Sequence, residues 1–303
     1  MKRITVSICI VVLLALCAVS VSCGIGENKV AVISLNGPIQ SEGSGLFFGG
    51  NVISPQSVRS QLERAKDDAA VKAIVIQVDS PGGTVAACQE ILSDIEQVKK
   101  PIVVSMGTVA ASGGYYISAK ADKIVALPGT LTGSIGVISE MPNLKGLFDK
   151  LGIDMQVFIA GKHKDMYAGF RDLTPEEKLI MQDMTDQLYN QFVKVVAEGR
   201  GLSEDKVREL ATGQLYTGVQ AKDLGLVDEL GGLNKAIDLA AGLAGIEKPK
   251  VDYYKPSVPS FLNTILGMGL QRLQGVIQVQ SLGAEGIILL ETLNNPYPQP
   301  EYR

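Results

Sequence analysis

The sequence predicts an α/β fold with buried, mainly parallel strands, and three observations lead to this class. Short apolar runs alternate with stretches of helical periodicity along most of the chain. Glycine-rich turns follow two of the apolar runs, at 79–83 and 112–114. The chain beyond residue 27 holds one cysteine, Cys88, so its fold depends on an apolar core, and it is long enough to bury a large one.

The elements are expected in a regular order along residues 28–250, which we take as one domain. Strands are predicted at 30–35, 73–78, 102–106, 123–127 and 155–159, with helices at 54–68, 84–99 and 113–120 between them. A capping-box pattern with proline at the first helical position predicts a longer helix over 174–198. The apolar face of this helix indicates core or subunit contact, and a shorter helix is expected at 203–212.

The N-terminal residues 1–27 are expected to tether the domain to a membrane. Lys2 and Arg3 precede an uncharged apolar stretch, 4–22, that is near the length needed to span a bilayer. The two cations favour a cytoplasmic N-terminus, so the domain is expected outside the cytoplasm. The stretch also fits a secretory signal, and small residues before Cys23 fit a lipoprotein signal that would leave Cys23 lipid-anchored.

The C-terminal residues 251–303 are expected to form an extension. Apolar residues within 258–280 fit an amphipathic helix, for which subunit contact, a membrane surface and an irregular addition to the core stay open. The formal net charge of the chain is −4, and this mild acidic excess excludes nucleic acid as a predicted partner.

Ser112 is the strongest candidate for chemistry. It stands between an apolar run and a predicted helix, with a glycine-rich turn, 79–83, that is able to approach it. A serine in such a place can combine a nucleophile with an oxyanion hole, although a helix N-cap is the ordinary role of a serine there. Gly113 is the natural first oxyanion donor, and Gly82 or Gly83 the second. Both segments follow strands, where α/β folds place their sites.

The base that activates the serine is restricted by composition. The chain contains a single histidine, His163, which excludes a two-histidine metal site. A Ser-His-Asp triad would have to use His163, and the Ser-Lys variant would use Lys162 or Lys164. A lysine acts as a base only when its amine is neutral, a form that burial favours. Spacing does not choose between the two lysines.

The motifs together resemble the signal peptide peptidase A family of membrane-anchored Ser-Lys peptidases. The resemblance covers about residues 29 to 250, and its motifs are Asp-Ser-Pro-Gly-Gly at 79–83, Ala-Ala-Ser-Gly-Gly-Tyr-Tyr at 110–116, Gly-Thr-Leu-Thr-Gly-Ser-Ile-Gly-Val at 129–137, Lys164-Asp165, Tyr-Thr-Gly at 216–218 and Gly-Leu-Val-Asp-Glu-Leu-Gly at 225–231. It implies Ser112 as nucleophile, Lys164 as base and Ser134 as the residue that orients the lysine. The related Clp-type peptidases favour Gly83, with Gly113, for the oxyanion hole.

The resemblance also implies a fold and a function. The fold would be a crotonase-like or Clp-peptidase-like stack of ββα units, assembled as a homo-oligomeric ring. The expected protein is a Ser-Lys endopeptidase of the bacterial cytoplasmic membrane, with its catalytic domain outside the cytoplasm and no cofactor or metal. Its substrates would be apolar peptides, including cleaved signal peptides. A Ser-Lys peptidase of membrane scaffold proteins, a crotonase-type acyl-CoA enzyme and an inactive partner protein are the alternatives.

Overall fold

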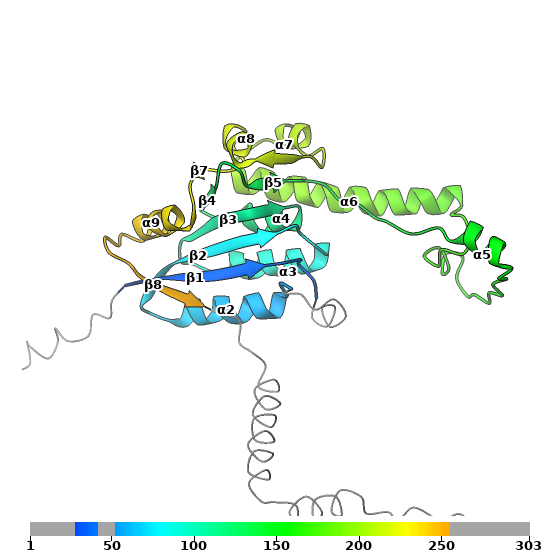
Figure 1. Cartoon of the computed structure of the whole chain (residues 1–303), viewed down its shortest axis with the longest axis horizontal. Coiled ribbons are helices and arrows are strands. Elements are labelled where there is room, and N and C mark those ends of the chain that lie inside the picture. Colours follow the sequence, from blue (N-terminus) through cyan, green and yellow to red (C-terminus); the bar gives the residue numbers. More distant parts are fainter. Residues whose placement is uncertain (1–27, 42–51, 255–303) are drawn as a thin grey trace, which may run out of the picture. The chain divides into compact units, whose positions relative to one another are not determined.

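The computed structural model describes residues 28–41 and 52–254, and their centre is a mainly parallel sheet (Figure 1). Its main path begins with the short strands β6 (Leu215–Thr217) and β5 (Leu131–Gly133) and continues in the order β3-β2-β1-β8. The central strands are β1 (Lys29–Asn36), β2 (Val71–Ser80) and β3 (Ile102–Ala111), and β8 (Lys250–Tyr254) pairs parallel to β1 at the edge. Three of the expected strands therefore form the middle of the sheet.

Helices cover both faces of this sheet, which explains why its strands read as nearly continuous apolar runs. One face packs against α2 (Pro55–Asp67), α3 (Val85–Glu96) and α4 (Gly113–Ser118), together with the C-terminal half of α6 (Pro175–Arg200). The other face packs against α9 (Leu233–Leu243), through residues such as Val32, Val75 and Ala240. The expected helices at 54–68, 84–99 and 113–120 thus correspond to α2, α3 and α4.

The strand β3 pairs with two different strands along its length. Its first half pairs with β4 (Lys123–Ala126), and its last residues pair with β5 (Leu131–Gly133). Asp79 holds the backbone between these halves, because its Oδ1 accepts a hydrogen bond from the N–H of Val109 at 3.0 Å. Around this edge lie β6 (Leu215–Thr217), α8 (Gly218–Asp223) and β7 (Glu229–Leu230).

The long helix α6 begins as the sequence predicts. Thr174 accepts a hydrogen bond from the N–H of Glu177, and the Glu177 carboxylate accepts one from the N–H of Thr174, which completes the capping box. The helix ends at Gly201, whose φ of 63° is the left-handed conformation of a C-terminal cap. The next helix, α7 (Glu204–Leu210), matches the one expected at 203–212, and α5 (Lys145–Leu151) was not expected.

The strand expected at 155–159 is wrong. These residues have no regular structure and are exposed, with Phe158 at 94%. The apolar run has the composition of a strand, but no described strand lies beside it to complete the backbone hydrogen bonds. The sheet also continues beyond the expected domain boundary, since β8 begins at Lys250 and extends to Tyr254.

Two predictions fall outside the described residues. They are the membrane tether at 1–27, with Cys23, and the amphipathic helix at 258–280. Within 28–41 and 52–254, no helix has both the length and the apolar character needed to cross a membrane.

Candidate active site

Ser112 occupies a strained turn between β3 and α4. Its φ of 51° and ψ of −120° lie outside the regions that side-chain-bearing residues ordinarily adopt. The turn is fixed by two hydrogen bonds, from the N–H of Ser112 to the carbonyl of Gly133 and from the N–H of Tyr116 to the carbonyl of Ser112, each 2.9 Å long. Such strain persists where the surrounding structure enforces it, and it concentrates at functional sites.

The glycine turn 79–83 packs directly against Ser112 and Gly113. A Cβ on Gly82, whose φ is 102°, would lie 2.6 Å from the Gly113 nitrogen and 2.9 Å from the Ser112 Cβ. A Cβ on Gly113 would lie 3.1 Å from the Gly83 nitrogen, so the two backbone nitrogens share one small region. Only glycine allows the two chain segments to approach this closely.

The backbone N–H groups of Gly83 and Gly113 are available to a ligand. The N–H of Ile39 donates to the carbonyl of Gly82, and the carbonyl of Ile39 accepts from the N–H of Thr84. These two hydrogen bonds lie on either side of Gly83 and leave its own N–H unused. Gly113 is the first residue of α4, where an N–H has no partner inside the helix. No residue in the described ranges accepts a hydrogen bond from either group. Two converging free donors are the requirement for holding an oxyanion.

Ser134 lies at the same edge of the sheet as Ser112. The last paired residues of β3 and β5 are Ala111 and Gly133, so each serine follows directly after the paired strand ends. Ser134 has a φ of 48°, and its N–H donates to the carbonyl of Gln214 at 2.8 Å. Among the described residues, these two serines are the only non-glycine positions with positive φ.

An apolar pocket of about 110 Å³ opens beside Ser112. Tyr116 and Phe192 meet edge to face in its wall, with ring centroids 5.1 Å apart. Cys88 is buried in this wall, and burial raises the pKa of its thiol to about 12, so it remains protonated. The complete lining consists of Gly83, Val85, Cys88, Ser112, Gly113, Tyr116, Gly136, Val137, Ile138, Leu188 and Phe192.

Sequence reasoning identified the serine and glycines of this pocket but missed its wall. Leu188 and Phe192 follow the apolar period of a helix, which indicates core or subunit contact and carries no signal for a pocket. The role of Asp79 in fixing β3 was missed as well, although its place in the Asp-Ser-Pro-Gly-Gly motif was a signal for it.

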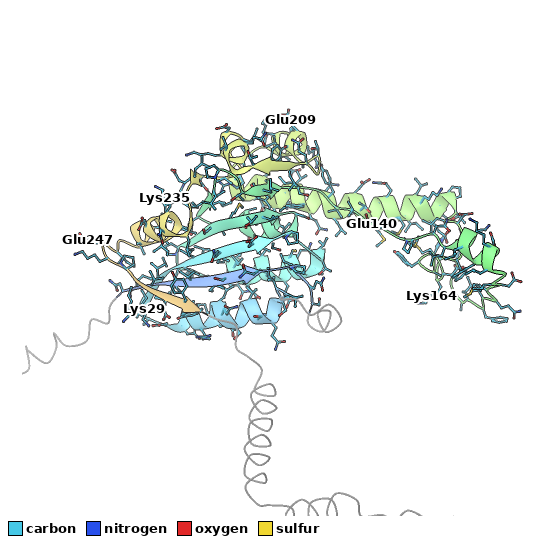
Figure 2. All side chains as sticks on the ribbon, viewed as in Figure 1. Lys29, Glu140, Lys164, Glu209, Lys235 and Glu247 are labelled. Carbon is cyan, nitrogen blue, oxygen red and sulfur yellow. The ribbon has the colours of Figure 1, made fainter. Side chains whose placement is uncertain are left out.

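Lys164 does not reach this site within one chain. It lies in a turn at 161–169, and two residues of this turn contact the first turn of α6. Lys162 pairs with Glu176, and His163 Nδ1 lies 3.4 Å from Glu177 Oε1. The pocket instead contacts α6 at Leu188 and Phe192, which lie 11 and 15 residues beyond Glu177, or about 16 and 22 Å along the helix. Figure 2 shows Lys164 beyond the N-terminal end of α6, away from the sheet.

Comparison with known proteins assigns the chain to a family. The model of peptidase family S49 matches residues 94–247, which include Ser112, Ser134 and Lys164. The chain belongs to peptidase family S49. A model of the Clp protease family also matches, over residues 44–132, and the mixed α/β architecture with its parallel sheet fits a Clp-protease-like fold. The S49 assignment confirms the family resemblance and makes the protein a serine peptidase.

Several relatives of this S49 peptidase have similar sequences. A protein of Enterococcus faecium whose name refers to signal peptide peptidase SppA is 36% identical over 84% of this chain and 74% of its own length. Protease 4 of Salmonella typhi is 36% identical over 79% of this chain, which corresponds to 38% of that protein. The chloroplastic serine protease SPPA of Arabidopsis thaliana is 34% identical over 79% of this chain and 37% of its own length.

A metal centre is not formed in the described part of this S49 peptidase. In residues 28–41 and 52–254, no group of three or more histidine, cysteine, aspartate or glutamate side chains is arranged so that it could hold a metal ion.

Proposed function

We propose that this serine peptidase cleaves peptides with a Ser-Lys dyad, in which Ser112 is the nucleophile and Lys164 the base. The observation that carries the proposal is the strained Ser112 beside two free N–H groups at the mouth of an apolar pocket. This arrangement supplies a nucleophile, an oxyanion hole and a binding site for one side chain of the substrate.

The reaction begins when Ser112 Oγ attacks the scissile carbonyl carbon and transfers its proton to Lys164 Nζ. The N–H groups of Gly83 and Gly113 hold the resulting oxyanion. Collapse of the tetrahedral intermediate breaks the C–N bond, and Lys164 gives its proton to the leaving amine. Water then attacks the carbonyl carbon of the acyl-enzyme and gives a proton to Lys164. Collapse of this second intermediate breaks the ester C–O bond, releases the carboxylic acid product and returns the proton to Ser112 Oγ. Ser134, at the neighbouring strand end, orients the lysine amine.

The base comes from a second copy of the chain. Lys164 is exposed and lies near the start of α6, whereas the Ser112 pocket of its own chain contacts the C-terminal half of that helix. Within one chain it therefore neither reaches the pocket nor has the burial that a lysine base needs. The residues just before the turn that carries Lys164 also include exposed large apolar side chains, among them Leu151 at 62% and Phe158 at 94%. A neighbouring subunit that covers this segment would bury these apolar side chains together with Lys164. The same contact, repeated from subunit to subunit, would form a homo-oligomeric ring.

The substrates we propose are apolar peptides, including signal peptides left after secretion. The pocket beside Ser112 is lined mostly by apolar side chains and glycines and by no charged side chain, so a small or apolar residue fits before the cleaved bond. The name of the Enterococcus faecium relative, which refers to a signal peptide peptidase, agrees with this choice. A tether at 1–27, as a transmembrane helix or through lipidated Cys23, would place the domain outside the cytoplasm at the bacterial cytoplasmic membrane.

Labelling by a serine-directed phosphonate tests the dyad. The wild-type protein should be labelled at Ser112, and Ser112→Ala should not be labelled at all. Lys164→Ala and Lys164→Arg should both react at least about a hundredfold more slowly, since neither side chain can accept the proton. His163→Ala and Lys162→Ala serve as matched controls from the same turn and should react at the wild-type rate. Loss of labelling in His163→Ala would show that the base is the histidine.

A further inference from the structure

Arg171 makes two paired contacts beside Lys164. Its Nε and Nη2 donate to the two carboxylate oxygens of Asp165, at 2.7 and 2.6 Å. Its Nη1 and Nη2 also donate to the two oxygens of Glu177, at 2.8 and 2.7 Å. One guanidinium therefore holds two carboxylates in fixed planes, an arrangement that needs the forked geometry of arginine.

These contacts connect the turn that carries Lys164 to the first turn of α6. Asp165 directly follows Lys164, and the N–H of Lys164 donates to the carbonyl of Gly161 at 3.1 Å. Glu177 is fixed from the other side, because it also forms the capping box of α6 and is only 1% exposed. The direction of the Lys164 side chain therefore depends on a rigid element through Arg171.

The same contacts decide what the Lys164 amine can pair with. Arg171 lowers the pKa of both Asp165 and Glu177, chiefly by hydrogen bonding to the charged carboxylates. With their oxygens occupied, neither carboxylate pairs with Lys164, which forms no ion pair in the described ranges. The adjacent Lys162 does pair, with Glu176. A free carboxylate near Lys164 would favour its ammonium form, which cannot act as a base.

We infer that Arg171 is a positioning residue for the base: it fixes the turn that carries Lys164 and prevents Asp165 and Glu177 from pairing with the lysine amine. The inference rests on the proposed role of Lys164. It also explains why the buried carboxylate of Glu177 is paired with arginine, a pairing that helix capping alone does not require. The charged groups that pair with one another between this turn, Arg171 and the first turn of α6 are Lys162, His163, Asp165, Arg171, Glu176 and Glu177.

The experiment compares the pH dependence of peptide cleavage in Arg171→Met and Lys162→Met, which each remove one cation paired with a glutamate at the start of α6. In Arg171→Met the freed carboxylates should pair with Lys164, so the limb on which kcat rises with pH should move up by about one pH unit. At pH 7, kcat should fall about tenfold, with KM changed less than about twofold. Lys162→Met should match the wild type.

Two further variants keep the test decisive. Asp165→Asn leaves the Arg171–Glu177 pair in place, so kcat should fall without any upward movement of the limb. If Arg171→Met does not assemble, Arg171→Lys replaces it, and an upward shift of the limb is still expected because lysine cannot pair with both carboxylates bidentately.

The inference is overturned if the limb of the arginine variant coincides with that of Lys162→Met, whatever happens to the amount of assembled protein. Lys164→Ala separates this result from failure of the proposed function. An inactive Lys164→Ala with an unmoved limb in Arg171→Met rejects only the role of Arg171. An active Lys164→Ala rejects both the base and its positioning residue.

Discussion

At the scale of single residues, the strain at Ser112 and Ser134 is the most informative property of the site. Both serines hold a positive φ directly after paired strand ends, and their backbone N–H groups donate to carbonyls of neighbouring segments. A serine used only as a helix cap would have an extended backbone and would accept a hydrogen bond from the helix, as Thr174 and Ser203 do. Ser112 accepts no such bond with its side chain.

Glu177 should give the protein a stability that depends on pH. Its pKa lies below the ordinary value, through Arg171 first and the N–H of Thr174 second. Because the folded pKa is the lower one, the stabilisation is complete above the unfolded value of about 4.3 and is lost as the pH falls below it. The thermal midpoint should therefore drop more between pH 6 and pH 3.5 in the wild type than in Glu177→Gln. Glu140→Gln, at an exposed position, is the control. An equal drop in all three proteins would contradict this.

At the scale of elements, α6 connects the two halves of the proposed chemistry. Its C-terminal half supplies Leu188 and Phe192 to the pocket, and its first turn holds the segment of Lys164 through Glu177. The helix is 26 residues long, or about 39 Å, so these two functions lie far apart in one chain.

The pocket wall on α6 should set which residue is accepted before the cleaved bond. Leu188→Ala removes part of the wall at a position that is only partly buried, so we expect a modest cost in stability. The ratio of kcat/KM for peptides with Phe over Ala at that position should rise about tenfold. Leu179→Ala lies on the same helix, exposed and outside the pocket, and should leave the ratio unchanged. No change in Leu188→Ala would place the substrate side chain elsewhere.

Burial explains why some strands were predictable from the sequence and why one predicted strand was wrong. The strands β1, β2 and β3 were predictable because they are buried on both faces and read as continuous apolar runs. The same signal failed at 155–159, where Met155, Val157 and Phe158 are apolar and yet exposed. A run of apolar residues indicates burial, but it does not say whether a sheet or another subunit provides it. Short strands such as β5 and β6 carry too few residues to form a pattern.

At the scale of the whole molecule, the proposed site divides into a part that one chain builds and a part, Lys164, that we assign to a second chain. Ser112, Gly113 and Gly83 were predictable because each stands in a glycine motif after an apolar run, and the fold brings these motifs together. Lys164 was preferred to Lys162 as the proposed base only through family resemblance, since neither of these exposed lysines carries a local signal. Its distance from Ser112 along α6 is a property of the tertiary structure that no motif spacing reveals.

Mixing two inactive variants tests the central claim, that Ser112 and Lys164 of different subunits form one site. Ser112→Ala retains the lysine, Lys164→Ala retains the serine, and each should be inactive alone. Unfolded and refolded together in equal amounts, they should recover peptide cleavage at about a quarter of the sites, because a head-to-tail contact pairs an intact serine with an intact lysine at that frequency. The double variant, mixed with either single variant, should recover none. A mixture of the single variants that co-assembles and yet stays as inactive as its components would show that serine and lysine must come from one chain, and it would contradict the account.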